Sequence, residues 1–276
     1  MGSTNRNIRL IYIIGNSHTG STILSLYLDS HPFINYVGEI KKLDQSFKDR
    51  FCTCGEDAER CPFWGPFIVR HQEYFNKPAK SNNGFYRFFS TYKSILTQSS
   101  KEEIEYERSF LDDLVIRCLK FNEGTEFIMD SSKSLKRFIT LSKMKGIEIY
   151  PIFIDRDLRS NLASFVKRGK GLLRSYLRLR INRYLILNHL NKNEIAHVKV
   201  NYERFVKHPD ETRKNVWNFV GLSEEGFEDV PIIGTHQITG NRKTLLQFPE
   251  NQAIIKLNEK EPFSPIQKIL LRILGL

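Results

Sequence analysis

Apolar and polar positions alternate in blocks along the chain, and the blocks predict strands separated by helices. Short apolar runs, which are typical of buried strands, cover residues 8–14, 126–130, 147–155 and 195–201. Helical segments follow at residues 23–28, 134–145, 159–168 and 210–220, and Gly221 ends the last of them. Because strands that alternate with helices form parallel sheets, we expect an α/β fold of three layers, with a mostly parallel central sheet flanked by helices.

Residues 41–125 interrupt this alternation with a cysteine-bearing loop and helical, aromatic-rich sequence. We interpret them as an insertion that shapes one wall of a site within a single domain of residues 1–276. Residues 262–276 predict an amphipathic helix, for which packing against the domain is favoured over peripheral contact with a membrane. Five aromatic residues of the insertion are expected in the core rather than in an acceptor pocket: Phe85, Tyr86, Phe88, Phe89 and Tyr92.

The composition gives the chain a net positive charge but does not identify the class of its binding partner. Lys and Arg number 42 and Asp and Glu 31 among the 276 residues, and the formal net charge of +11 favours anionic ligands. The polar N-terminus leads into an apolar run that is too short to span a membrane and lacks a cleavage site. We therefore predict a cytoplasmic protein.

The first strand leads into the run Gly15-Asn-Ser-His-Thr-Gly20-Ser21-Thr22, which has the form of a phosphate-binding loop before a helix. Backbone N–H groups and the helix dipole at such a turn favour an anion. A loop that binds nucleoside triphosphates has a lysine before its final Ser or Thr, where this chain has Ser21. The loop keeps the anion site but lacks the charge that suits a triphosphate.

A second signal for an anion lies at the end of the strand at 147–155. Arg156 leaves this strand, and Ser164 follows eight residues later in the next helix. A guanidinium and a hydroxyl in this arrangement can converge on one phosphate. The alternative is a surface ion pair of Arg156 with Asp155 or Asp157. The loop at residues 15–22 favours the phosphate.

Together these motifs resemble the sulfotransferases that use 3′-phosphoadenosine 5′-phosphosulfate (PAPS). That family has a loop Lys/Arg-Ser/Thr-Gly-Ser/Thr-Ser/Thr, here His18-Thr-Gly-Ser-Thr22, and a strand that ends in Arg with Ser eight residues on, here Arg156 and Ser164. Further blocks resemble the branch that contains tyrosylprotein sulfotransferases and many bacterial enzymes: Leu28-Asp-Ser-His-Pro32 with Gly38-Glu39, Asp130-Ser-Ser-Lys133, Tyr202-Glu203, and His236-Gln-Ile-Thr-Gly-Asn-Arg242.

The resemblance implies that a sulfuryl group moves from PAPS to a hydroxyl of a saccharide, lipid, peptide or small metabolite, with adenosine 3′,5′-bisphosphate as product and no metal required. It implies Glu39 as the general base. The cation that stabilises the bridging oxygen is a Lys or Arg in the family, and here His18 or Lys133 is expected in that role. The residues expected to bind the donor are Ser17, His18, Thr19, Gly20, Ser21, Thr22, Arg156, Ser164, Tyr202, Gly240, Asn241 and Arg242.

Three of the four cysteines lie close together in the sequence, as Cys52, Cys54 and Cys61. Such a cluster can bind zinc, with His71 or a group elsewhere as the fourth ligand, or can form a disulfide, or can remain as free thiols. A cytoplasmic location disfavours the disulfide. The missing fourth ligand disfavours zinc, so no metal is predicted.

Two other functions fit parts of the sequence. A nucleoside or small-molecule kinase with a degenerate phosphate-binding loop would use Asp130 near Mg²⁺, but Ser21 and the pair of Arg156 and Ser164 argue against it. A non-enzymatic basic protein that binds nucleic acid or acidic glycans would use the arginine-rich segment at 168–183. These arginines fall on several faces of a helix, so a solvated helix is favoured and no nucleic acid is expected.

Overall fold

One parallel sheet organises the fold. The structure is a computed structural model and describes residues 7–43, 50–75, 99–223, 236–241, 244–245 and 262–276. In these residues five strands pair in the order β2-β3-β1-β4-β5, and every pair is parallel. This sheet confirms the predicted fold class. The strands are β1 (Ile8–Gly15), β2 (Ile34–Tyr36), β3 (Phe127–Asp130), β4 (Ile147–Asp155) and β5 (Val198–Asn201).

Helices connect the strands. The described ones are α1 (Ser21–Leu28), the 3-10 turn η1 (Ile40–Lys42), α2 (Trp64–Arg70), α3 (Gln72–Phe75), α5 (Lys101–Phe121), α6 (Leu135–Ser142), α7 (Leu158–Val166), α8 (Leu172–Lys192), α9 (Tyr202–Lys207), α10 (Pro209–Val220) and α12 (Pro265–Ile273). The sequence pattern predicts α6, α7 and α10 close to their observed bounds. As predicted, α10 ends at Gly221, which has φ 80°. The pattern does not predict β2, because three residues are too few to show a periodicity.

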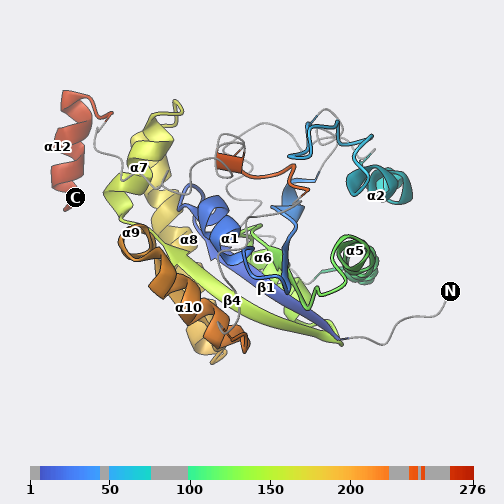
Figure 1. The fold of residues 1–276 in the computed structure, drawn as a ribbon. Coiled ribbons are helices and arrows are strands. Elements are labelled where there is room, and N and C mark those ends of the chain that lie inside the picture. Colours follow the sequence, from blue (N-terminus) through green and yellow to red (C-terminus); the bar gives the residue numbers. More distant parts are fainter. Residues whose placement is uncertain (1–6, 44–49, 76–98, 224–235, 242–243, 246–261) are drawn as a thin grey trace.

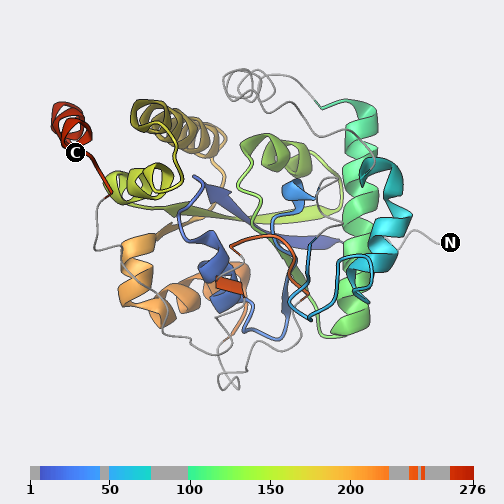
Figure 2. The ribbon, with the colours of Figure 1, turned by 90° about the horizontal axis from the view of Figure 1, so that it is seen from above.

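The sheet is the middle one of three layers (Figures 1 and 2). Successive side chains of a strand point to opposite faces. Leu10 and Tyr12 share a core with α5, α6 and α8, whereas Ile11 and Ile13 share the other core with α1, α9 and α10. Since both faces are covered, β1 is a continuous apolar run, and these four side chains are all 0% exposed.

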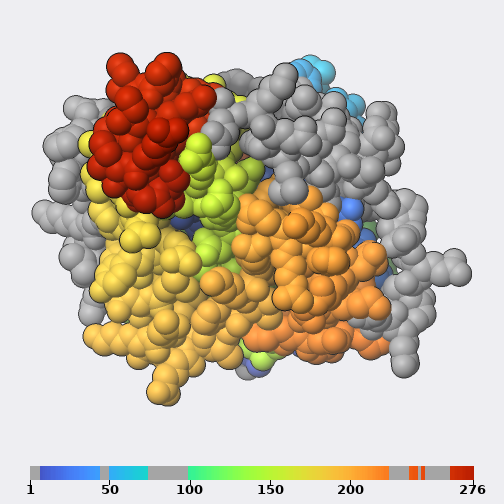
Figure 3. All heavy atoms as spheres, turned by 90° about the vertical axis from the view of Figure 1, so that its left-hand side faces the viewer, coloured from blue at the N-terminus to red at the C-terminus, as the bar shows by residue number. Residues whose placement is uncertain are grey.

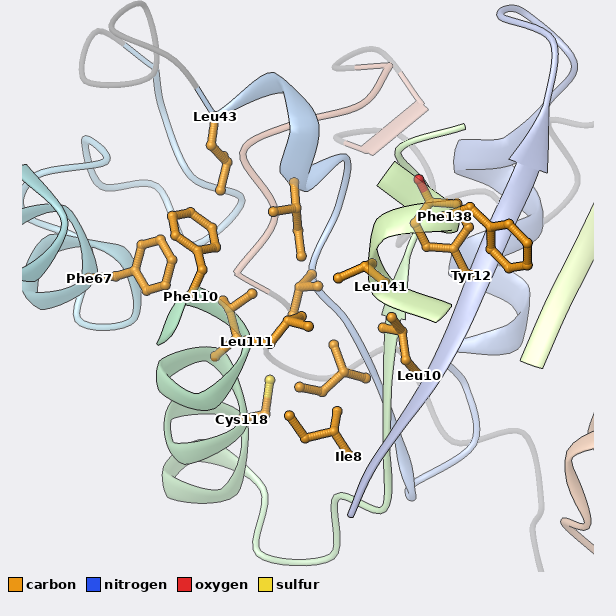
Figure 4. Close-up of a cluster of buried hydrophobic side chains, with 14 of the residues drawn as sticks. Ile8, Leu10, Tyr12, Leu43, Phe67, Phe110, Leu111, Cys118, Phe138 and Leu141 are labelled. Atoms are coloured by element: carbon orange, nitrogen blue, oxygen red, sulfur yellow. The ribbon is translucent and has the colours of Figure 1, made fainter. Parts of the chain in front are cut away.

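The described part of the expected insertion packs onto the main core. Figure 4 shows Phe67 of α2 and Phe110 of α5 in one cluster with Leu10 of β1 and Leu141 of α6. Residues 50–75 and 99–125 are therefore joined to the sheet through shared apolar burial. The aromatic residues between 85 and 92 lie outside the described residues.

The C-terminal helix α12 lies on α7 and α8 (Figure 3). Its Leu271 is 0% exposed and belongs to one cluster with Leu162 of α7 and Leu179 of α8. Ile266 and Ile273 of the same helix are 72% and 74% exposed, so only part of its apolar side is covered by the described residues. None of the helices in the described ranges is both long enough and apolar enough to cross a membrane.

Candidate active site

The carboxyl ends of the strands meet at one edge of the sheet, and each strand is followed by a residue expected in the site. Ligands of parallel sheets bind beyond this edge. The loop at 16–20 follows β1, and the strands β2, β3, β4 and β5 lead to Glu39, Lys133, Arg156 and Tyr202. The topology therefore gathers residues from five distant parts of the sequence.

The loop between β1 and α1 requires glycine at position 20. Gly20 has φ 85°, and a Cβ there would lie 2.1 Å from Cε2 of Tyr202. Gly20 is also the N-cap of α1, and no side chain of the described residues caps this helix, so its first N–H groups remain for an anion. His18 has φ 64°, a left-handed conformation that is rare for residues with a side chain and is often found at functional sites.

Two polar side chains of the loop support the turn itself. Thr19 is 1% exposed, and its hydroxyl donates to the carbonyl oxygen of Asn16 (2.9 Å). The Asn16 side chain accepts from Asn182 of α8 (2.8 Å) and donates to the carbonyl oxygen of Leu179 (3.2 Å). Helix α8 therefore holds the loop in place. Ser17 lies half-buried in the same turn.

The start of α1 contacts the segment at 236–241. The Thr22 hydroxyl accepts from the backbone N–H of Asn241 (3.2 Å). A Cβ on Gly240, which has φ 137°, would lie 3.3 Å from Cγ2 of Thr22. Gly240 and Asn241, which the resemblance implies as donor-binding residues, thus lie beside the loop. Arg242 lies outside the described residues.

A lysine from the end of β3 lies beside the loop at the position where its own lysine is missing. Nζ of Lys133 donates to Oγ of Ser21 and to the carbonyl oxygen of Ser131, both at 2.8 Å. It also lies 3.2 Å from Oε1 of Glu39, whose Oε2 is 2.6 Å from Nζ of Lys42. We call Ser21, Glu39, Lys42 and Lys133 the ammonium end of the site. The tertiary structure supplies here a cation that the loop lacks.

Glu39 is a buried carboxylate held between two ammonium groups. It is 4% exposed, and its backbone N–H donates to Oγ1 of Thr239 (2.6 Å). Burial acts to raise the pKa of Glu39, but Lys133 and Lys42 outweigh it and hold the pKa below its ordinary value. Burial lowers the pKa of Lys133, and the Glu39 carboxylate opposes that shift. Glu39 is therefore ionised at neutral pH and able to accept a proton.

Arg156 forms a second cationic centre. Its Nη1 donates to the carbonyl oxygen of His18 (2.9 Å) and lies 3.5 Å from Oγ of Ser164, and its guanidinium carbon lies 4.6 Å from the ring centre of Tyr202. Nε is 4.0 Å from Oε1 of Glu203 and has no hydrogen-bond partner in the described ranges. We call His18, Arg156, Ser164 and Tyr202 the guanidinium end of the site. A buried cation with an unused donor suits an anionic ligand.

The surface ion pair considered as the alternative for Arg156 is replaced by other contacts. Asp155 pairs with Arg183 of α8, whose Nη2 and Nε lie 2.9 and 3.0 Å from Oδ2. Asp157 caps α7 by accepting from the backbone N–H of Ser160 (2.8 Å). Arg183, in the segment predicted as a solvated basic helix, has a side chain that is 42% exposed and still reaches the end of β4 with its guanidinium.

His18 connects the two ends of the site but carries no charge at neutral pH. Its ring packs edge-on against Phe165, with 4.8 Å between the ring centres. Burial, followed by the charges of Arg168, Lys42 and Lys133, lowers the pKa of His18 to about 4. Of the two candidates for a cation beside the loop, Lys133 is the one that is ion-paired with Glu39.

Sequence reasoning missed three contributors to the site. Lys42 contacts Glu39 at a spacing of three residues, and Nη1 of Arg168 donates to the carbonyl oxygen of Ser164 (2.8 Å) at a spacing of four. Such spacings place residues on one side of a helical turn and would be the signal for both. Thr239, which binds the N–H of Glu39, is 200 residues away in the chain and has no local signal.

Asp130, which a kinase would use near Mg²⁺, is engaged in structural contacts. It is 0% exposed, and its Oδ1 accepts from the backbone N–H (2.8 Å) and the hydroxyl (2.5 Å) of Ser132. Its Oδ2 pairs with Arg137, which also binds Glu107 of α5 (2.7 Å). Both oxygens of Asp130 are therefore occupied by groups of the protein.

The cysteine cluster meets His236 and not His71. Cys52, Cys54 and Cys61 form no disulfide with any described residue, and their sulfurs and a ring nitrogen of His236 lie within 4.8 Å of one another. His71 is buried elsewhere, with Nε2 3.2 Å from Oδ2 of Asp113. Of the two alternatives considered for the fourth member, the structure places the group from elsewhere in the chain, His236, at the cluster.

No family model and no curated protein matches the sequence. Among solved structures, the chain is similar to the sulfotransferase domain of the olefin synthase of Synechococcus PCC 7002 (14% identity, TM-score 0.48, covering 100% of this chain and 98% of that one). It is similar to the sulfotransferase domain of the curacin biosynthetic pathway (15% identity, TM-score 0.49, 98% of each chain). A third is the sulfotransferase STF9 of Mycobacterium avium (12% identity, TM-score 0.42, 81% of this chain and 66% of that one). Because identities are 12–15%, we base the functional proposal on the residues of the site itself.

Proposed function

We propose that the protein is a sulfotransferase that moves the sulfuryl group of PAPS to an acceptor hydroxyl. The observation that carries this proposal is the presence of two cationic centres at one loop, with Lys133 on Ser21 and Arg156 on the His18 carbonyl. PAPS has anionic groups at both its 5′ and 3′ positions, so it needs two such centres. A nucleoside triphosphate carries its charge in one chain of phosphates and needs only the first.

The residues present fit this donor. At the guanidinium end, Nε of Arg156 lacks a hydrogen-bond partner in the described part of the chain, and the Ser164 hydroxyl lies beside the same guanidinium. These groups would hold the 3′-phosphate, because the planar fork of an arginine matches a phosphate. At the ammonium end, the uncapped N–H groups of α1 and the Lys133 ammonium would hold the 5′-phosphosulfate.

The ammonium end also fits the chemistry. PAPS supplies the sulfuryl group and leaves as adenosine 3′,5′-bisphosphate. Glu39 takes the proton of the acceptor hydroxyl, since its carboxylate is ionised and buried beside the loop. Lys133 stabilises the negative charge that grows on the bridging oxygen as its bond to sulfur breaks and the bond from sulfur to the acceptor oxygen forms. Positioning and charge stabilisation are the main needs of such an in-line transfer.

The kinase alternative has less support. Both carboxylate oxygens of Asp130 are engaged by Ser132 and Arg137. The position of the loop lysine is Ser21, and Lys133, the cation beside it, is paired with a candidate general base. This arrangement favours the deprotonation of an acceptor next to the transferred group.

Ligand-dependent melting followed by an activity assay tests the proposal. We expect adenosine 3′,5′-bisphosphate to raise the melting temperature more than ATP–Mg²⁺ does. Incubation with labelled PAPS and acceptor extracts, followed by mass spectrometry, should give a product with an added sulfate. Glu39→Gln should lower the rate at which that product forms by at least about 100-fold, whereas Glu123→Gln, at an exposed position, should not. Stabilisation by ATP–Mg²⁺ alone, or full activity of both Glu39→Gln and Arg156→Ala, would rule the proposal out.

A further inference from the structure

The cysteine cluster brings together four metal-binding side chains from two distant segments. Sγ of Cys61 lies 3.2 Å from Nδ1 of His236, and Sγ of Cys52 lies 3.7 Å from the same nitrogen. Sγ of Cys54 lies 3.8 Å from Sγ of Cys61. Sequence spacing unites the three cysteines, and the fold adds the histidine.

We propose that Cys52, Cys54, Cys61 and His236 bind one Zn²⁺ as a structural site. Zinc prefers four tetrahedral ligands from cysteine and histidine, and three Cys with one His is a common closed set. With Zn–S near 2.3 Å and Zn–N near 2.0 Å, tetrahedral geometry gives ligand separations of about 3.5–3.8 Å. The Cys54–Cys61 and Cys52–His236 separations, 3.8 and 3.7 Å, fall in that range, the Cys61–His236 separation of 3.2 Å is somewhat shorter, and all four ligand atoms lie within 4.8 Å of one another.

Hydrogen bonds and ring stacking around the four ligands hold them in place. The Cys52-Gly55 turn closes through a hydrogen bond from the Gly55 N–H to the Cys52 carbonyl oxygen (3.0 Å). On the histidine side, Nε1 of Trp64 donates to the carbonyl oxygen of His236 (2.6 Å), and the Phe63 ring stacks on the His236 ring at 5.6 Å. Supporting contacts of this kind orient metal ligands.

The two segments are also joined next to the ligands. The backbone N–H of Thr53 donates to the carbonyl oxygen of Gln237 (3.0 Å), and the N–H of Gln237 donates to the Thr53 hydroxyl (2.9 Å). Thr53 lies between two of the cysteines, and Gln237 directly follows the histidine. This reciprocal pairing fixes the approach of the segments at the point where a metal would link them.

The site has a position in the fold that suits a structural metal. The segment that follows His236 carries Thr239, which binds the backbone N–H of Glu39, and Asn241, which binds Thr22. Gly38 shows how closely this segment is packed, since a Cβ there would lie 2.3 Å from Oγ1 of Thr239. Zinc at the cluster would hold this segment against the candidate active site. The metal itself takes no part in the proposed transfer, so the inference stands whether or not the proposed function does.

Metal content of the full chain, purified without chelator, is the first test. We expect about one zinc per chain. Cys61→Ser and His236→Ala should lose it, while His236→Cys should keep it, because four cysteines are an equally suitable ligand set. Cys118→Ser is the matched control, since Cys118 is a buried cysteine that does not belong to the group of four converging ligands, and its loss should leave the zinc content unchanged.

Thiol reactivity gives a second test. It uses the protein without substitutions, so its result does not depend on whether a variant folds. Cys54 is exposed, so as a free thiol it should be alkylated rapidly in the native protein. Bound to zinc, it should react only after a chelator removes the metal. Cobalt reconstitution should add the visible absorption of a tetrahedral thiolate site. A folded protein without metal whose Cys54 reacts at once, or one with a disulfide among these cysteines, would overturn the inference.

Discussion

The two ends of the site hold positive charge in opposite ways. At the ammonium end, the Glu39 carboxylate lies between the ammonium groups of Lys133 and Lys42, at 3.2 and 2.6 Å. At the guanidinium end, Arg156 contacts a carbonyl oxygen, a hydroxyl and an aromatic face, and its Nε lies 4.0 Å from the carboxylate of Glu203. The Glu39 carboxylate offsets only one of the two ammonium charges at its end, whereas the Arg156 charge is met mainly by neutral groups.

This difference suggests a separate role for each end of the site, with the reaction at one end and ligand binding at the other. The two ammonium groups keep Glu39 ionised, which is the form that a general base needs, and Lys133 can turn from Glu39 to the charge on a leaving group, so the ammonium end suits chemistry. A buried guanidinium without a carboxylate at hydrogen-bond distance gains most from a bound anion, so the guanidinium end suits binding.

Removing the carboxylate at the ammonium end should affect turnover alone. Glu39→Gln is expected to lower kcat by about 10²–10⁴-fold, which is the usual contribution of a general base. Affinity for adenosine 3′,5′-bisphosphate should stay the same or rise, because Lys133 loses the anion that it binds in the free protein. Turnover of labelled PAPS and calorimetric titration measure the two quantities. A large loss of bisphosphate affinity would show that Glu39 serves binding instead.

A side chain at Gly20 should disturb both ends at once. Gly20→Ala would force a left-handed alanine and push a methyl group into the Tyr202 ring, at an expected cost of about 2–5 kcal/mol in the free energy of unfolding. Gly169→Ala is the matched control, since Gly169 has φ 69° and open space around it, and it should cost only about 1–2 kcal/mol. Urea unfolding compares them. Equal costs would mean that Tyr202 does not pack on the loop.

Replacing the Arg156 guanidinium should weaken binding of the 3′-phosphate and leave binding of the remainder of the nucleotide unchanged. Arg156→Lys keeps the charge but loses the bidentate donors, so affinity for adenosine 3′,5′-bisphosphate should fall about 10–100-fold, the value of one or two charge-assisted hydrogen bonds. Affinity for adenosine 5′-monophosphate, which lacks the 3′-phosphate, should hardly change. Arg180→Lys, at an exposed position of α8, is the control. An equal loss for both nucleotides would place Arg156 at the 5′ side.

The neutral His18 should give the smallest effect, as a pH dependence of stability. Its pKa is about 4 in the folded protein and 6.5 ordinarily, so the unfolded chain binds more protons between these values. Stability therefore rises as pH increases from about 4 to 6.5 and is lost as pH falls through that window. His18→Asn, which tolerates the left-handed backbone, should flatten the curve by about 1 kcal/mol, allowing for solvent screening. Urea unfolding at pH 4.5 and 7 measures this difference, and an unchanged slope would contradict a buried neutral imidazole.

Local pattern predicted most of the sheet. Residues 147–155 form β4 with the predicted bounds, because nine residues of mainly apolar, β-branched sequence leave little choice. The strand predicted at 195–201 begins only at Val198. The residues before Val198 belong to the connection from α8, which ends at Lys192. The sequence pattern did not predict the three-residue strand β2. Its pairing with β3 comes from the sheet and not from its own composition.

The sequence predicted only part of the candidate site. Resemblance named Glu39, Lys133, Arg156 and Tyr202, and the structure brings these residues to one edge of the sheet. Resemblance did not name Lys42, whose contact with Glu39 depends on the 3-10 turn after β2. It also gave no partner for the cysteines, because His236 is separated from Cys61 by 175 residues.

By itself, the sequence determined the alternation of strands and helices, the glycine-dependent loop after β1, and the lack of a lysine within that loop. These features are local, since burial periodicity and backbone conformation depend on neighbouring residues. The tertiary structure decided that Lys133 fills the space beside Ser21, that His18 is neutral, and that His236 joins the cysteines. Strand order and loop closure set these contacts. They depend on which distant segments share an edge of the sheet, and no local pattern records that choice.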